Sequence, residues 1–135
     1  MNISTKGRYG LRAVLDLAQQ KEGKPVPLSS ISAKQHISEG YLEQIMRPLK
    51  KTGLVSSVRG AKGGYLLAKD PKDILVSEVI FALEGPFNVV SCTNDKFNRH
   101  CQLEEGCFSK KLWGELQEAI EGVLNSYSLA DLLDD

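Results

Sequence analysis

The stretch 28–67 constrains the fold of this chain more than any other part of the sequence. Its first part, residues 28–36, predicts a short helix, because serine hydroxyls near its start can cap a helix and three apolar residues form a thin stripe. Ser38 is a candidate N-cap for a second helix, whose apolar residues recur at the i, i+3, i+4, i+7 spacing of one buried face. These residues are Leu42, Ile45, Met46 and Leu49. Thr52-Gly53 should end this helix, since Gly readily takes the left-handed conformation found at helix ends.

The opposite face of the second helix is free to contact another molecule. It combines hydrogen-bonding side chains that can read base edges with cations that can bind phosphates. The candidate DNA-binding residues here are Ser38, Tyr41, Glu43, Gln44, Arg47, Lys50 and Lys51, and Glu39 lies on the same face. Pro48 costs about 3 kcal/mol in a regular helix interior. We therefore expect a kink or a restart at Pro48, without loss of the helix.

A β-hairpin is predicted directly after this helix. Residues 55–58 and 65–67 have the composition of two short strands, and the tip between them carries Arg59, Lys62 and three glycines. Duplex binding needs a helix for the major groove and cations for the flanking phosphates or the minor groove. The order helix, turn, helix, basic hairpin therefore predicts a winged helix-turn-helix. The alternative is that the same elements only build the core of a small α+β domain.

Charge is distributed unevenly along the 135 residues, although the net charge is zero. Residues 1–70 hold 12 Lys and Arg against 5 Asp and Glu, a net of +7, and residues 71–135 hold 5 against 12, a net of −7. A basic front half is expected of a DNA-binding unit. It includes a helix predicted over residues 5–20, where Lys6, Arg8 and Arg12 face outward and can clamp a phosphate.

Three cysteines lie in a loop that follows a helix predicted over residues 76–83. The chain starts with no signal peptide and has no apolar stretch of membrane-spanning length, so we expect a cytoplasmic protein with reduced thiols. A structural disulfide is therefore not expected of Cys92, Cys101 and Cys107. Thiolates favour iron-sulfur clusters, and zinc is the second metal that such ligands select.

The segment after Cys107 predicts a long helix and a short terminal one over residues 128–133. Apolar residues recur every three to four positions, which favours a helix that pairs with its copy in a homodimer. The alternative is a helix that folds back on its own domain. The apolar residues are Phe108, Leu112, Leu116, Ala119 or Ile120, and Val123 or Leu124. The expected fold is mainly α with a small hairpin wing: a winged helix-turn-helix domain (1–84), a cysteine loop (85–107), and a dimerisation helix with a C-terminal tail (108–135).

Four runs, residues 4–9, 37–44, 53–60 and 63–67, closely resemble the iron-sulfur cluster regulators, the IscR-type winged-helix family of bacterial transcription regulators. The resemblance extends over nearly the whole chain. It implies a homodimer that binds double-stranded operator DNA and holds one 2Fe-2S cluster per subunit near the dimer interface. It also implies control of the genes that build such clusters, with the iron-sulfur assembly machinery as a possible cluster donor.

The resemblance extends to individual site residues, with one departure. Cys92, Cys101 and Cys107 match the family's three thiolate ligands, although the first gap is wider here. The family's histidine ligand, three residues after the last cysteine, is replaced by Lys110, and a protonated lysine cannot ligate. The fourth ligand is open, and the candidates are His100, Asp95, Glu104, Glu105 or a group outside the loop. The resemblance further implies that Glu43 is a specificity switch between two operator classes.

Two other functions compete with a cluster-sensing regulator. One is a regulator of the same fold that senses thiol oxidation without a metal, or that binds zinc. The other is a cytosolic thiol enzyme with Cys101 or Cys107 as nucleophile and His100 as base. Adjacent residues do not naturally point at one another, and no nucleotide-binding motif or paired-carboxylate site supports an enzyme. We therefore expect no catalytic residues.

Overall fold

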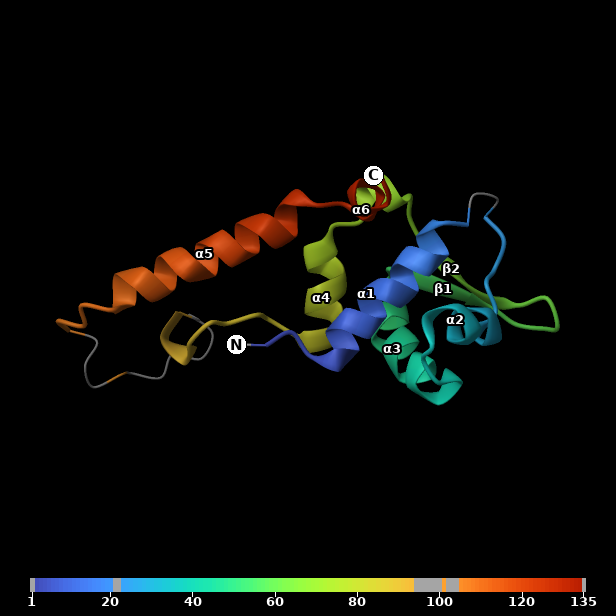
Figure 1. Ribbon diagram of the computed structural model, residues 1–135, viewed down its shortest axis with the longest axis horizontal. Coiled ribbons are helices and arrows are strands. Elements are labelled where there is room, and N and C mark those ends of the chain that lie inside the picture. Colours follow the sequence, from blue (N-terminus) through green and yellow to red (C-terminus); the bar gives the residue numbers. More distant parts are fainter. Residues whose placement is uncertain (1, 21–22, 94–100, 102–104, 135) are drawn as a thin grey trace.

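The computed structural model describes residues 2–20, 23–93, 101 and 105–134. It is mainly helical with one β-hairpin, as predicted. A winged-helix body occupies one part of the molecule, and the longest helix extends away from it as an arm (Figure 1). The described elements are α1 (Thr5–Ala18), α2 (Leu28–Gln35), α3 (Glu39–Lys51), β1 (Val55–Val58), β2 (Gly64–Leu67), η1 (Pro71–Asp73), α4 (Val76–Glu84), η2 (Ser91–Thr93), α5 (Lys110–Ser126) and α6 (Leu129–Leu133).

The second helix of the helix-turn-helix, α3, follows the prediction closely. The Ser38 hydroxyl caps it by accepting from the Tyr41 N–H at 3.2 Å. The helix continues through Pro48 and closes at Gly53, whose φ is +79°, with the Leu54 N–H donating to the Leu49 carbonyl at 3.0 Å. α3 therefore has a fixed start and a fixed end, which holds its exposed face in one orientation.

The hydrophobic core lies beneath α3. All four residues of its predicted apolar face have no exposed surface, and they pack with α1, α4 and the strands. Leu129 of α6 is also fully buried in this core, because the backbones of Ile74 to Val76 and of Tyr127 to Leu129 are hydrogen-bonded to each other. The C-terminal helix therefore returns to the winged-helix body. None of the helices in the described part of the chain is long and apolar enough to cross a membrane.

The hairpin wing is antiparallel, with Val55 opposite Leu67 and Val58 opposite Gly64. Val26, which precedes α2, exchanges two backbone hydrogen bonds with Tyr65 at 2.8 and 2.9 Å. Gly64 permits this approach, since a Cβ there would lie 2.3 Å from the Val26 carbonyl oxygen. The base of the wing is thereby fixed to the segment that leads into the helix-turn-helix.

Three local predictions were wrong. No serine hydroxyl caps α2, because the helix begins at Leu28 with Pro27 in the N-cap position, and both serines lie inside its first turn. α1 ends at Ala18 instead of residue 20. Phe108 is not part of the long helix, which starts at Lys110, and the Phe108 side chain is fully exposed.

Candidate nucleic-acid interface and cysteine site

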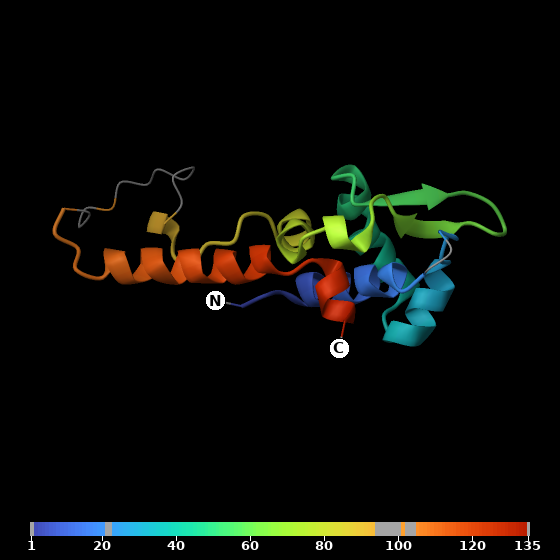
Figure 2. The ribbon, with the colours of Figure 1, turned by 90° about the horizontal axis from the view of Figure 1, so that it is seen from above.

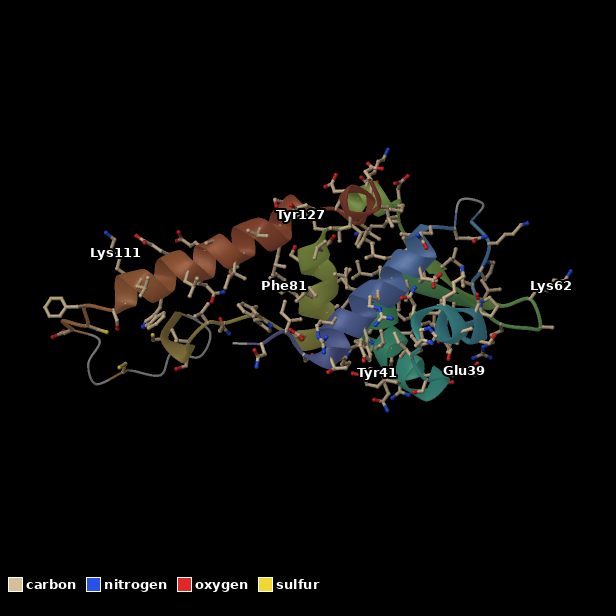
Figure 3. The ribbon with its side chains drawn as sticks, viewed as in Figure 1. Glu39, Tyr41, Lys62, Phe81, Lys111 and Tyr127 are labelled. Atoms are coloured by element: carbon tan, nitrogen blue, oxygen red, sulfur yellow. The ribbon has the colours of Figure 1, made fainter. Side chains whose placement is uncertain are left out.

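The exposed face of α3 carries most of the predicted DNA-binding residues. Glu43, Gln44, Arg47, Lys50 and Lys51 are all exposed, as are Ser38 and Glu39 at the start of the helix. Figure 3 shows Glu39 and Tyr41 at the edge of the body, with Lys62 beyond them at the end of the hairpin. One surface therefore presents both hydrogen-bonding and cationic groups, which base edges and phosphates require.

Tyr41 differs from its neighbours on α3 because it is half-buried against α1. Its ring meets the Tyr9 ring edge to face, with centroids 6.1 Å apart and planes at 87°. The guanidinium groups of Arg8 and Arg12 lie 5.9 and 5.3 Å from the Tyr9 ring centroid. Tyr41 is thus oriented by α1, and Arg8 remains exposed beside it.

A polar network fixes α2 against α1, and sequence reasoning did not find it. Arg12 donates to the side chain of Gln35 at 3.2 Å and also to its carbonyl oxygen. The Gln35 amide in turn donates to Asp16 at 3.2 Å, and Lys34 lies 3.8 Å from the same carboxylate. Asp16 is only 4% exposed. A carboxylate on the apolar face of a predicted helix was the one available signal, because buried charges require partners.

A shallow open depression lies where the start of α1 meets α3. Its lining combines three cations with one amide side chain and a proline. The lining residues are Lys6, Gln44, Arg47, Pro48 and Lys51. Lys6 is half-buried, whereas the three polar residues of α3 are exposed. Residues predicted separately on two helices are therefore brought together at one place.

The wing carries its two predicted cations at the tip. Arg59 and Lys62 are both exposed, and the tip is closed by a hydrogen bond from the Gly63 N–H to the Gly60 carbonyl at 2.9 Å. The hairpin projects from the body at the end of the molecule that is remote from the start of α5, in both orthogonal views (Figures 1 and 2). These two cations are therefore available to a partner molecule at a distance from the α3 face.

The cysteines lie outside the winged-helix core. Cys92 in η2 and Cys101 are exposed, Cys107 is half-buried just before α5, and all three are free thiols. Within the described ranges, no three His, Cys, Asp or Glu side chains come close enough to hold a metal ion. Cys92, Cys101 and Cys107 are therefore not brought together into one site in the part of the chain that the structure describes. His100, Asp95 and Glu104 lie outside the described residues, and Glu105 is exposed.

Cys107 has an environment that favours the thiolate. Its Sγ lies 3.3 Å from the Ser109 Oγ, and this hydrogen bond, followed by one from the Ser109 backbone, lowers the pKa of the Cys107 thiol. Partial desolvation opposes the shift, while the backbone N–H and the positive charge of Lys110 add to it. A protonated Lys110 cannot ligate a metal, but it supports the ionised state of the neighbouring Cys107 thiol.

The segment that leads to Cys92 is attached to α5 through Gln117. This side chain is 6% exposed, and its amide group donates to the Phe87 carbonyl at 2.6 Å and to Glu121 at 2.8 Å. Its oxygen accepts from the Val89 N–H at 2.8 Å. Sequence reasoning missed Gln117, because the residues it joins are about thirty positions apart in the chain.

α5 also presents apolar surface to the outside. Ala119, Ile120, Val123 and Leu124 line an open hollow, and Leu112 and Val123 are 56% and 59% exposed. Helices of soluble proteins normally bury such residues.

Residues 3–135 match the model of the Rrf2 family, described as "Iron-dependent Transcriptional regulator". The chain belongs to the Rrf2 family. Relatives within Rrf2 include the HTH-type transcriptional regulator IscR of Photorhabdus laumondii, which is 45% identical over 133 residues that make up 98% of this chain and 79% of that protein. The Escherichia coli K12 IscR is 44% identical over the same length, which is 80% of that protein.

Solved structures of similar proteins have the same fold. CymR of B. subtilis, named as its global cysteine regulator, has a TM-score of 0.83 at 40% identity and covers 98% of this chain and 95% of its own. The IscR of T. potens has a TM-score of 0.79 at 43% identity and covers 100% of this chain and 88% of its own. This Rrf2 chain is a winged-helix transcriptional regulator of IscR type and not an enzyme.

Proposed function

We propose that this protein is a homodimeric DNA-binding regulator that senses iron-sulfur cluster status through a labile 2Fe-2S cluster and controls the genes for cluster biogenesis. The observation that carries the proposal is the place of Cys92, Cys101 and Cys107. All three lie between α4 and α5, outside the winged-helix core, in a family described as iron-dependent regulators. Thiols placed in this way can bind or lose a metal group while the DNA-binding body stays folded.

The chemistry of the donors fits a cluster. Three free cysteines supply thiolate ligands, and the environment of Cys107 stabilises its ionised form. His100 remains the candidate fourth ligand, since Lys110 stands where the family has a histidine. When bound, the cluster would supply a centre that oxidants or iron scarcity can remove.

Two regions would contact operator DNA. α3 would enter the major groove with Tyr41, Glu43 and Gln44 toward base edges, while its cations and Arg8 reach phosphates. The wing would place Arg59 and Lys62 at the flanking backbone or minor groove. Apart from the half-buried Tyr41, these residues are all exposed on one body, which supports the assignment.

The exposed apolar stripe of α5 supports a homodimer. A second copy of the chain would cover Ile120, Val123 and Leu124 by pairing its own α5 with this one. Two DNA-binding bodies related by a two-fold axis would then match a two-fold operator.

A second candidate function is a regulator that senses thiol oxidation without a metal. The lowered pKa of the Cys107 thiol favours it, because thiolates are the form that oxidants attack. Similar structures also include Staphylococcus aureus CymR in a form named as oxidized, with a TM-score of 0.78 at 35% identity. Zinc is the third alternative for the same thiols.

Anaerobic purification with iron and sulfide analysis separates these functions. The cluster predicts a brown protein with iron and acid-labile sulfide in equal amounts. Cys92→Ala, Cys101→Ala and Cys107→Ala should each abolish that colour, yet leave a folded dimer by circular dichroism and light scattering. Ser91→Ala, beside the first cysteine, is the matched control. A colourless wild type with zinc or no metal contradicts the proposal, and loss of the fold in all three variants indicates a structural metal.

A further inference from the structure

The structure assigns the depression between α1 and α3 as a seat for one phosphate of the DNA backbone, in which Lys6, Arg47 and Lys51 act together. This inference rests on DNA binding as part of the proposed function. It goes further because it selects one ligand group and treats Lys6 of α1 and two cations of α3 as a single site.

The positions of the lining residues on the two helices support the assignment. Gln44, Arg47 and Lys51 are spaced by three and four residues, so their side chains form one stripe along α3. This stripe faces Lys6, which lies in the first turn of α1 and is half-buried at the other side of the depression. Cations from two helices thus converge on one small volume instead of spreading over a flat face.

Charge and shape define the class of ligand. Of the described residues that line the depression, three are cationic, one is an amide and none is acidic. An anion with several acceptor oxygens would satisfy these donors. The depression is open to solvent, so it fits a group carried on a larger molecule. A helix in the major groove has backbone phosphates on either side, and a duplex therefore presents such a group beside α3.

Glu84 fixes the α1 wall of this seat. Its carboxylate accepts from the Ser4 N–H, and the Ser4 hydroxyl accepts from the Gly7 N–H at 3.2 Å. Gly7 leaves room for Glu84, since a Cβ there would lie 2.5 Å from the carboxylate oxygen. A carboxylate at a helix N-terminus is also favourable to the helix dipole. Glu84 is thus a positioning residue for Lys6, and it is the last residue before the cysteine loop.

The test uses a mixed-sequence duplex of about 30 base pairs, because phosphate contacts do not depend on the operator. Affinity is measured over a range of NaCl concentrations for wild type and for the triple variant Lys6→Ala, Arg47→Ala, Lys51→Ala. The slope of log K against log salt is negative. If the three cations share one phosphate, the magnitude of this slope should be smaller in the triple variant than in the wild type by roughly 0.9, the value of one phosphate. A fall of about 2.7 would mean three separate phosphates, and no fall would mean none; either result overturns the seat.

Control variants distinguish a wrong phosphate seat from a wrong proposal of DNA binding. Lys72→Ala removes an exposed lysine of η1 and should leave the slope unchanged. Arg59→Ala should weaken binding through the wing. If the wild type shows no salt-dependent binding to the duplex, the proposed DNA binding is wrong. If the wild type binds and the triple variant has the same salt slope, only the phosphate seat is wrong.

Variants of Glu84 provide a second test, which measures affinity for the same duplex. Glu84→Ala should weaken binding to the duplex about as much as Lys6→Ala, roughly fivefold, and should add nothing in the Lys6→Ala background. Glu84→Gln keeps an acceptor oxygen and should retain most of the affinity. Additive losses from Glu84→Ala and Lys6→Ala would show that Glu84 does not act through Lys6.

Discussion

Arg59 tests the wing at the scale of a single residue. It is an exposed, planar cation beside Gly60, and it can enter a minor groove or bind a phosphate. Arg59→Ala should weaken operator binding strongly, while the protein remains folded, because the side chain lies outside the core. Footprinting on operator DNA measures the effect, with Lys69→Ala as the control for charge. An unchanged footprint would show that the wing does not contact DNA.

Cys107 provides a prediction about pH. Its pKa is lowered chiefly by the Ser109 hydroxyl, so the thiolate is present at lower pH than for an ordinary cysteine. Ser109→Ala should raise the pKa of Cys107 and shift the onset of its alkylation to higher pH. The rate of iodoacetamide labelling at Cys107, followed by mass spectrometry between pH 6 and 10, measures this shift. Identical profiles in wild type and Ser109→Ala would show that the hydroxyl does not stabilise the thiolate.

At the scale of residues, the sequence predicted which face of a helix is buried better than it predicted which side chains contact each other. The buried stripe of α3 and its exposed side followed from periodicity, because one helix determines both. Gln117, Glu84 and the Asp16–Gln35 contact did not, because each joins residues that are distant in the chain. Local pattern can mark a buried carboxylate such as Asp16, but it does not identify the partner. The three cysteines were found by composition, but which other groups approach them depends on the conformation of the loop.

At the scale of an element, a variant of α5 tests the proposed homodimer. Val123 is 59% exposed on the apolar stripe, so Val123→Glu would place a charge in the paired helices and should shift the protein toward monomer. Light scattering over a range of concentrations measures the association. Glu118→Ala, an exposed position of the same helix, should leave the dimer intact. If Val123→Glu remains a dimer with wild-type affinity, the interface lies elsewhere.

The order and type of the elements could be predicted, whereas several boundaries could not. α3, the two strands and α4 appear within one residue of the predicted ranges, because their periodicity and glycine signals are strong. The start of α5 was set too early, since Phe108 fits the apolar spacing although it precedes the helix. Spacing alone does not show where a helix begins, and the Ser109 hydroxyl at the N-cap makes no capping hydrogen bond to α5.

At the scale of the whole molecule, the two predicted sites lie far apart within one chain. The wing tip and the start of α5 occupy opposite ends of the long axis, as the positions of Lys62 and Lys111 in Figure 3 show. In the proposed sensor, a signal from the cysteines to the DNA-binding face would pass through α4 and α1 of the same subunit or through the second copy of the proposed homodimer. The Glu84 contact is one physical link along the first route.

We propose that Glu43 connects the cysteine site to the DNA-binding face. A variant of Glu43 tests this connection most directly. An exposed carboxylate on the DNA-reading face is unfavourable beside phosphates, unless it accepts from a cytosine or rejects other sequences. The hypothesis is that cluster binding changes the placement of Glu43 and so admits a second class of operators. Glu43→Ala should then give the cluster-free protein access to that class.

The measurement is the affinity of cluster-free wild type and cluster-free Glu43→Ala for duplexes that the cluster-loaded protein selects from a random pool, at one fixed salt concentration. We expect tighter binding by Glu43→Ala, by the roughly 1–3 kcal/mol that one base contact is worth. Duplexes selected by the cluster-free wild type serve as the control, because they should remain bound by the wild type. Equal affinities of the two proteins for the cluster-selected duplexes would contradict the switch.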